Sequence, residues 1–281
     1  MSIQPPMEFI AEAATNWTLR DEILFAPSTS SVSYPDNRRQ TNFEVEDQSF
    51  WFQHRRKCIE TVLQRFPPAG FFLDVGGGNG FMTSALQKIG ISAILVEPGE
   101  GGCRNALRRG VRHILCGSLE DMDFTHVRAG AVGLFDVLEH IAEESRFLQI
   151  VHTSLNSGGR LFLSVPASPV LWSHEDQSAG HFRRYTAAGL KAALETAGFR
   201  VLYCSHFFLC LIPGLFFLRV LPYRLNLRRK NSESTLPKEH HLTGRSYLRS
   251  LVMWGLAPEV GMLNAHSIPA GTSLVCVAEK I

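Results

Sequence analysis

The residues best suited to chemistry begin with a glycine-rich loop. Residues 71–80 read FFLDVGGGNG, an apolar run that ends in an acid and four glycines, and a helix-like segment follows from Phe81. Glycines let the backbone turn sharply and let a ligand approach closely, and a helix N-terminus offers N–H groups to a carboxylate. The dinucleotide-binding spacing G-x-G-x-x-G is excluded because Phe81 and Thr83 stand where it needs glycine. The loop therefore predicts a ligand that has a carboxylate and no pyrophosphate.

Polar residues end the next two predicted strands, 92–97 and 112–116. The carboxylate of Glu97 could accept hydrogen bonds from both hydroxyls of a ribose, with a solvated acid at a strand end as the alternative. The glycine loop nearby favours the ribose. Ser118 and Leu119 could hydrogen-bond and flank an adenine, or they could form a simple turn. S-adenosylmethionine (SAM) carries a carboxylate and no pyrophosphate, and it is the ligand that these residues indicate.

Three ionisable residues follow the fourth predicted strand, 130–135. If residues 136–145 are helical, Asp136, Glu139 and His140 lie on one face, because they are spaced three and four apart. Two carboxylates and an imidazole can hold a divalent ion. The alternative is that Glu139 and His140 connect loops by hydrogen bonds.

A second polar cluster follows the fifth predicted strand. His181 could act as a general base, Tyr185 lies in the same segment, and the arginines at 183 and 184 could clamp an anionic acceptor. The alternative is a structural network in which His181 and one arginine fix the loop. Residues 174–176, His-Glu-Asp, are a third candidate, for which a solvated loop is favoured.

The composition bounds the class of protein. The chain has 281 residues, 45% of them hydrophobic, and a net charge of +2, which does not argue for nucleic acid. Six cysteines without a C-x-x-C pair fit a reduced compartment, so a cytoplasmic location is expected. The first 26 residues carry Glu8, Glu12 and Asp21 among their acids and have no continuous apolar stretch, which predicts that there is no ordinary secretion signal.

Predicted strands and helices alternate along the chain. Such alternation predicts a doubly wound α/β fold, a parallel sheet with helices on both faces. Residues 1–45 are expected to be weakly ordered, and an amphipathic helix is expected at 47–66. The expected strands are 71–75, 92–97, 112–116, 130–135, 159–165, 199–206 and 272–279, and the expected helices between them are 81–89, 101–109, 138–155 and 187–198.

An apolar segment interrupts this alternation before the last strand. Residues 207–218 are apolar, Pro213-Gly214 interrupts them and Arg219 ends them. A membrane-spanning helix needs about 20 residues, so this segment does not span. It could lie in a membrane interface over 207–230, with basic residues on anionic head groups. A roof over an apolar acceptor pocket or a homodimer contact is favoured over that.

The motifs together resemble the class I SAM-dependent methyltransferases, in the broad small-molecule group that carries V-L-E-H after strand four. The resemblance covers about 43–207 and 271–281, and the segment 172–185 is similar to a signature of a bacterial subgroup. It implies a Rossmann-like sheet of seven mostly parallel strands with a helical cap or insert. The residues that it places at the cofactor are Asp74, Gly76, Gly77, Gly78, Gly80, Glu97, Pro98, Ser118, Leu119, Phe135 and Asp136.

The same resemblance bears on catalysis and metal binding. His140, His181 and Tyr185 are the catalytic candidates. The Asp136, Glu139 and His140 set is similar to the E-x-x-E-H motif of quinone-biosynthesis O-methyltransferases and small-RNA 2′-O-methyltransferases, which is associated with Mg²⁺, although aspartate replaces the first glutamate here.

The sequence thus predicts a methyltransferase for a small or lipid-like acceptor, with O- or N-methylation favoured. The alternatives are a catalytically inactive SAM-binding regulatory protein and an RNA methyltransferase; no nucleic acid is expected as a partner. The location is expected to be cytoplasmic, with peripheral contact to the inner face of a membrane as an open alternative. The expected domains are an extension with a lid helix (1–66), the SAM-binding core (67–207), the insert (208–270) and the last strand (271–281).

Overall fold

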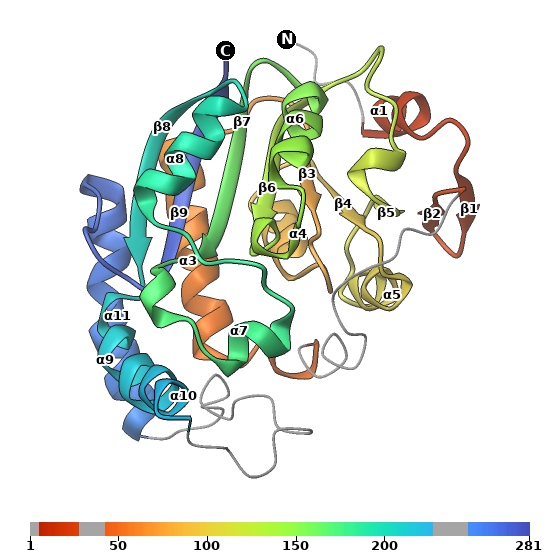
Figure 1. Ribbon diagram of the computed structural model, residues 1–281. Helices are drawn as coiled ribbons and strands as arrows, with labels where there is room; N and C mark the ends of the chain where they lie inside the picture. The colour runs from red at the N-terminus through yellow and green to blue at the C-terminus, as the bar shows by residue number, and fades with distance from the viewer. Residues whose placement is uncertain (1–5, 28–42, 227–246) are drawn as a thin grey trace.

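A single mixed sheet forms the centre of the molecule (Figure 1). The computed structural model describes residues 6–27, 43–226 and 247–281. Within those residues nine strands are hydrogen-bonded in the order β1-β2-β5-β4-β3-β6-β7-β9-β8. The strands are β1 (Thr18–Arg20), β2 (Ile23–Phe25), β3 (Phe72–Val75), β4 (Ala93–Glu97), β5 (Ile114–Cys116), β6 (Ala129–Phe135), β7 (Leu155–Pro166), β8 (Phe199–Phe207) and β9 (Ser273–Lys280).

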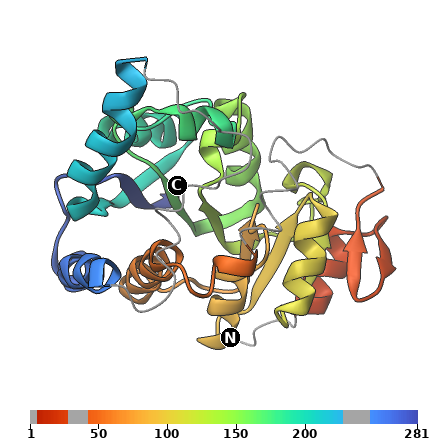
Figure 2. The same ribbon diagram turned by 90° about the horizontal axis from the view of Figure 1, so that it is seen from below.

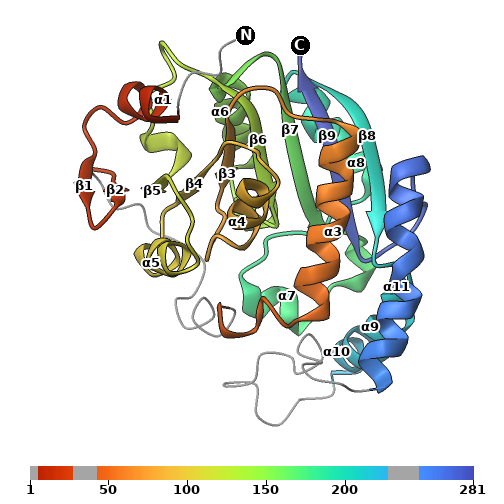
Figure 3. The ribbon, with the colours of Figure 1, turned by 180° about the vertical axis from the view of Figure 1, so that it is seen from behind.

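Helices cover both faces of this sheet, as Figures 1 and 3 show from opposite sides. One face carries α1 (Pro6–Ala13), α6 (Glu144–Ser154) and α8 (Ala187–Thr196). The other carries α3 (Phe50–Arg65), α4 (Phe81–Lys88), α5 (Glu100–Arg108) and α11 (Tyr247–Ala265). The alternation of side chains along each strand divides the core between the faces: Leu73 and Val75 of β3 pack on the first, and Phe72 packs on the second. The doubly wound α/β prediction is confirmed.

The strand pairing determines where a ligand can bind. Strands β5, β4, β3, β6 and β7 run parallel, whereas β9 is antiparallel to both β7 and β8. The chain order reverses between β3 and β6, and ligands of such sheets bind at the carboxyl ends of the strands beside this reversal. The loops after β3, β4, β5, β6 and β7 are the ones singled out from the sequence, and they lie along this edge.

The N-terminal region was wrongly expected to be weakly ordered. Residues 6–27 form α1, β1 and β2, and β2 extends the sheet by pairing in parallel with β5. This accounts for nine strands instead of seven. The apolar side chains of α1 enter the core, because Phe9 packs on Phe71 with ring centroids 5.4 Å apart. The turn-rich part of the segment, residues 28–42, lies outside the described residues.

The segment after β6 also differs from the expected helix 138–155. It starts with a short 3₁₀ turn at Leu138–His140 and becomes α-helical only in α6. Asp136 has a left-handed backbone, with φ 58°, so the chain turns sharply there instead of entering a helix. The face expected to bring together the residues at 136, 139 and 140 therefore does not form.

The insert is helical within the described residues. It consists of a 3₁₀ turn (Leu209–Leu211), α9 (Ile212–Leu215), a π-helical turn (Phe216–Val220), α10 (Leu221–Arg224) and α11. The view from below shows these helices at the side of the molecule beyond β8 (Figure 2). None of the described helices combines the length and apolar character that crossing a membrane would take.

Candidate active site

The glycine loop after β3 turns with three left-handed residues. Gly76, Gly78 and Gly80 have φ values of 67°, 57° and 70°, which side chains larger than hydrogen rarely adopt. The first and last are also packed tightly, because a Cβ atom at either position would lie within 2.8 Å of a neighbouring side chain. At Gly78 a Cβ would meet no atom within 4 Å. Gly78 therefore faces open space, where a ligand can approach the backbone.

Asp74 lies beneath this loop at the end of β3 and is fully buried. One carboxylate oxygen accepts a hydrogen bond of 2.6 Å from Thr83 Oγ1, and the other, Oδ1, has no hydrogen-bond partner. Burial raises the pKa of Asp74 to about 6, against the hydrogen bond from Thr83 and the charge of Arg55. An unsatisfied buried acceptor next to a ligand-facing loop fits the ammonium group of an amino-acid ligand such as SAM.

Glu97 ends β4 beside the same loop and is also buried. Its two oxygens accept backbone hydrogen bonds from Gly78 (3.0 Å) and Gly99 (2.7 Å). The acid thus fixes the glycine loop, and its role toward the ribose stays a prediction. Pro98 follows it directly and is half-buried.

The segment after β5 that was expected to contact adenine forms a capped 3₁₀ turn. Ser118 donates its hydroxyl to Asp121 (2.7 Å) and caps a 3₁₀ turn, and Leu119 is buried in the core. Trp17 of the N-terminal region packs against this segment and donates from Nε1 to the Asp121 carbonyl oxygen. The space beside Gly117 is filled by the Trp17 ring, which a Cβ there would overlap. The adenine roles of Ser118 and Leu119 stay predictions.

Asp136 is held by a buried arginine from α3. Arg55 Nε lies 2.8 Å from Asp136 Oδ2, and Arg55 Nη2 donates to the carbonyl oxygen of Phe135 (2.7 Å). The other carboxylate oxygen of Asp136 accepts from the Ser164 hydroxyl on β7 (2.9 Å). Arg55 also lies over the Trp51 ring, 5.3 Å from its centroid. This contact connects the aromatic leading helix to the end of β6, and Arg55 was not among the predicted site residues.

The aromatic residues of α3 pack as core. Trp51 stacks on Phe208 with ring centroids 5.7 Å apart, and Phe52 meets Phe81 edge-on at 5.8 Å. Both residues are half-buried against the same hydrophobic cluster. These contacts are those of core packing, and the lid role of this helix stays a prediction.

Three of the predicted catalytic and metal-binding residues do come together, in a different combination. The metal-ligating atoms of Glu139, His140 and His181 all lie within 4.8 Å of one another, and the two histidine rings meet edge-on at 4.8 Å. Burial and the negative charge of Asp136 raise the pKa of Glu139 well above its ordinary value. Mg²⁺ prefers oxygen ligands, and one carboxylate with two imidazoles does not fit that preference. The Asp136, Glu139 and His140 magnesium set is therefore not supported.

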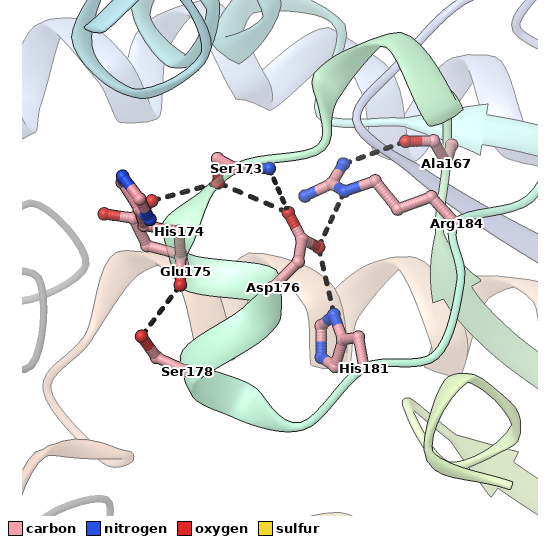
Figure 4. A network of polar contacts seen from close by, with 8 residues as sticks. All are labelled: Ala167, Ser173, His174, Glu175, Asp176, Ser178, His181 and Arg184. Atoms are coloured by element: carbon pink, nitrogen blue, oxygen red, sulfur yellow. Dashed lines mark hydrogen bonds and ion pairs between the residues drawn. The ribbon is translucent and has the colours of Figure 1, made fainter. Parts of the chain in front are cut away.

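His181 is fixed by a buried aspartate (Figure 4). Its Nδ1 lies 3.0 Å from Asp176 Oδ1, which also accepts from Arg184 Nε at 2.7 Å. Asp176 Oδ2 accepts from the backbone N–H of Ser173 at 2.9 Å. Burial opposes ionisation, but the hydrogen bond from His181 and the charge of Arg184 lower the pKa of Asp176. The favoured prediction of a solvated loop at 174–176 is thus wrong for Asp176, which is 1% exposed.

The neighbours of this pair place it beside the end of β6. The backbone N–H of Phe182 donates to the Glu139 carbonyl oxygen (2.8 Å), which anchors the segment next to His140. Arg183 pairs with Glu144 at the start of α6 (2.9 Å). The arginines at 183 and 184 are therefore occupied by structural partners in the described part of the chain.

Tyr185 has the surroundings of a core residue. It is 5% exposed, and its hydroxyl donates to the Leu138 carbonyl oxygen (3.4 Å). Burial raises the pKa of the Tyr185 phenol, so its proton is held more tightly than usual. Its predicted catalytic role is untested, and these contacts favour His181 over Tyr185 as a base.

A network outside the loop supports the cofactor side and was not predicted. Asn79 of the glycine loop donates to Glu46 (3.1 Å), and Arg109 pairs with Glu46 and Asp47 at 2.7 Å. Asn105 of α5 donates to Asn79 in turn (3.0 Å). These residues lie far apart in the sequence, and no local pattern marks them.

The fold and the loops along the carboxyl edge define a Rossmann-like nucleotide-binding protein whose geometry fits SAM. The match to known families agrees with this class. A family described as "Methyltransferase domain" matches residues 50–203, more than half of the chain. The chain therefore belongs to this methyltransferase family, and the expectation of a class I SAM-dependent methyltransferase is confirmed at the level of family and fold.

Individual relatives are distant. The chain is 24% identical over 163 residues to a probable S-adenosylmethionine-dependent methyltransferase of Mycolicibacterium smegmatis, covering 56% of this chain and 62% of that protein. It is 28% identical over 172 residues to the mitochondrial ubiquinone biosynthesis O-methyltransferase of Mus musculus, covering 50% and 46%. The chain thus spans less than two thirds of the length of these curated relatives. A SAM-dependent methyltransferase of Thermotoga maritima, described as a possible histamine N-methyltransferase, shares the fold, with a TM-score of 0.54 and 17% identity over 87% of this chain and 95% of that one.

Proposed function

We propose that the protein transfers the sulfonium methyl group of SAM to a hydroxyl or amine of a small or lipid-like acceptor. The observation that carries this proposal is the pair of buried Asp176 and half-buried His181 beside Glu139 and His140, along the same sheet edge as the glycine loop. The similarity to a ubiquinone biosynthesis O-methyltransferase favours a hydroxyl as the acceptor group.

The cofactor side supplies position more than chemistry. Bound SAM carries an activated methyl group that an aligned nucleophile can displace in line. Gly78 leaves room for the ligand, Asp74 offers an unsatisfied acceptor, and Glu97 holds the loop and is the residue that we assign to the ribose hydroxyls. Good alignment of two reactants can lower a barrier by roughly 7–11 kcal/mol. These residues therefore need to hold the cofactor rigidly, which matches the burial of Asp74 and Glu97.

The acceptor side supplies a base. Ionised Asp176 accepts a hydrogen bond from His181 Nδ1–H, so the tautomer that this contact favours leaves Nε2 as the proton acceptor. A hydroxyl acceptor has to lose its proton as the methyl group is transferred, and His181 Nε2 can take that proton. Arg184 fixes Asp176 from the other side, so Asp176 and Arg184 act as positioning residues.

The experiment is methylation of an acceptor panel, small and lipid-like, with labelled SAM and purified protein. We expect His181→Ala to reduce kcat by roughly 10²–10⁴-fold with SAM affinity by calorimetry unchanged, because a general base contributes that much. His126→Ala, at an exposed histidine remote from this cluster, is the matched control and should keep full activity.

The two alternatives predict different outcomes. A regulatory SAM-binding protein would bind SAM with no turnover on any acceptor. An RNA methyltransferase would transfer label to bulk RNA in a filter-binding assay. Equal activity of His181→Ala and the unaltered protein would refute the assignment of the base while leaving the methyltransferase activity intact.

A further inference from the structure

The last helix of the insert exposes apolar side chains. From residue 250 to 265 its only ionisable residue is Glu259, which is buried. Glu259 lies 2.8 Å from His54 Nε2 and accepts from the backbone N–H groups of Phe208 and Leu209, so it fixes α11 to the core. The outer side carries Leu251, 63% exposed, and Trp254, 78% exposed. The solvent-facing side of a surface helix normally carries charged residues. The outer side of α11 is apolar instead, so it is adapted to an apolar or interfacial environment.

A second exposed apolar group lies in the other half of the insert. Phe217 is 63% exposed, Leu218 57% and Leu225 59%. The two halves meet where Cys210 faces Gly255 of α11, and both lie beyond β8 in Figures 1 and 2. Six of the eleven exposed large hydrophobic residues in the described part of the chain fall in this insert, which makes it the main apolar surface. We call it the insert surface, and it comprises Leu209, Phe217, Leu218, Leu225, Leu251 and Trp254.

The charge of the same region is strongly positive. Residues 219–249 contain eight lysines and arginines and two glutamates, a net charge of +6. The whole chain has a net charge of +2, so the rest of the protein carries −4. This basic stretch includes the connection between α10 and α11, which starts and ends at the insert surface. Apolar residues flanked by a basic segment match an anionic lipid surface, with its acyl chains and negative head groups.

We infer that the insert surface docks on an anionic membrane and lies in its interface without crossing it. The charge disfavours a second copy of the chain, because a symmetric contact through this surface would bring two +6 segments together. The basic side chains at 228–230 lie outside the described residues, and only their charge enters the argument.

The insert surface is connected to the acceptor side of the active site. Tyr223 of α10 meets His174 of α7 (His174–Ala179) edge-on at 4.6 Å, and its hydroxyl accepts from Gln177 Nε2 at 3.3 Å. Arg224 donates to the Val170 carbonyl oxygen (3.1 Å). The segment that carries Asp176 therefore packs on the docking helices. If docking occurs, an acceptor dissolved in the bilayer is the natural substrate class, a consequence that also rests on the proposed function.

Vesicle flotation tests the docking directly. We expect the full chain to float with vesicles that contain phosphatidylglycerol and to bind pure phosphatidylcholine vesicles at least about tenfold more weakly. Leu251→Glu/Trp254→Glu should reduce binding to the anionic vesicles by about tenfold or more. The matched control is Leu19→Glu, at a residue 67% exposed on β1, and it should bind as the unaltered protein does.

A second measurement tests the docking without the double variant, in case that variant does not fold. Tryptophan fluorescence of the unaltered protein should shift to the blue with anionic vesicles, and the conservative Trp254→Phe variant should lose most of the shift. Equal flotation of the double variant and the unaltered protein would overturn the inference, as would a dimer that the double variant dissociates while neither protein binds vesicles. SAM binding to the unaltered protein is measured in parallel. If the unaltered protein does not bind SAM, the proposed function is refuted and the docking result is unaffected.

Discussion

The two halves of the sheet's carboxyl edge are built by different means. Around β3 and β4 the ligand-facing loop is held through its backbone: Glu97 accepts from the N–H groups of Gly78 and Gly99, and Asp74 lies directly beneath the loop. Around β6 and β7 the contacts join distant segments, because Arg55 of α3 reaches Asp136 and the loop after β7 returns to β6. The comparison teaches that the cofactor half depends on backbone conformation, whereas the acceptor half depends on long-range packing of side chains.

The largest effect is expected where the acceptor half positions its base. Asp176→Asn should lower kcat by roughly 10²-fold or more with SAM affinity unchanged, because the neutral amide no longer orients and stabilises His181 as the carboxylate does. Steady-state kinetics and calorimetry separate the two quantities. Glu175→Gln is the matched control, since Glu175 also contacts Ser173 but is not the residue that fixes His181. A fall in SAM affinity in Asp176→Asn would show that the two halves are not independent.

On the cofactor half, Asp74 should make stability depend on pH. The folded-state pKa of about 6 lies above the ordinary 3.8, so protonated Asp74 favours the folded state. That contribution is complete below about pH 4 and is lost as the pH rises through about 6, which amounts to up to about 3 kcal/mol of unfolding free energy. Urea denaturation from pH 4 to 7 without SAM should show this loss, relative to Asp74→Asn. Parallel pH profiles of the two proteins would mean that Asp74 is not perturbed.

The glycine loop offers a sharper test of its ligand-facing residue. Gly78→Val should weaken SAM binding by roughly 10–100-fold, because the side chain enters the open space that the ligand needs. Gly90→Val is the matched control: Gly90 also has a left-handed backbone, with φ 85°, and also faces open space, but it lies in the turn after α4. If calorimetry finds that both variants bind SAM with the same reduced affinity, the reduction comes from backbone strain and not from a side chain in the ligand site.

The smallest effect is expected from metal removal. Treatment with a chelator should change methylation less than about twofold, because the proposed base is a histidine fixed by an aspartate and does not depend on a metal-activated acceptor. The assay compares rates before and after chelation, with added Mg²⁺ as the control. A large loss of methylation rate that added Mg²⁺ restores would support a metal site at Glu139 and His140 and contradict the proposed base.

Several features could be predicted because their signals are local. The acid and glycines at 74–80 and the acid at 97 depend on backbone turns that a few neighbouring residues specify. The apolar periodicity predicted six of the seven strands of the main fold to within two residues, for example 71–75 against the observed Phe72–Val75, whereas β7 begins four residues before the predicted 159–165. The strands of residues 18–25 were missed, because each has only three residues and the pair joins the sheet through β2, whose partner β5 is distant in the sequence.

The sequence alone thus determined the doubly wound sheet and the cofactor loop, since both follow from short-range patterns of apolar residues, acids and glycines. Only the tertiary structure decided which polar side chains meet. It replaced the expected 136, 139 and 140 face with a cluster of Glu139, His140 and His181, because the turn at Asp136 and the returning loop after β7 set the distances. It also placed Asp176 under His181 and Trp254 in solvent, since burial is a property of the packed chain and no window of sequence contains it.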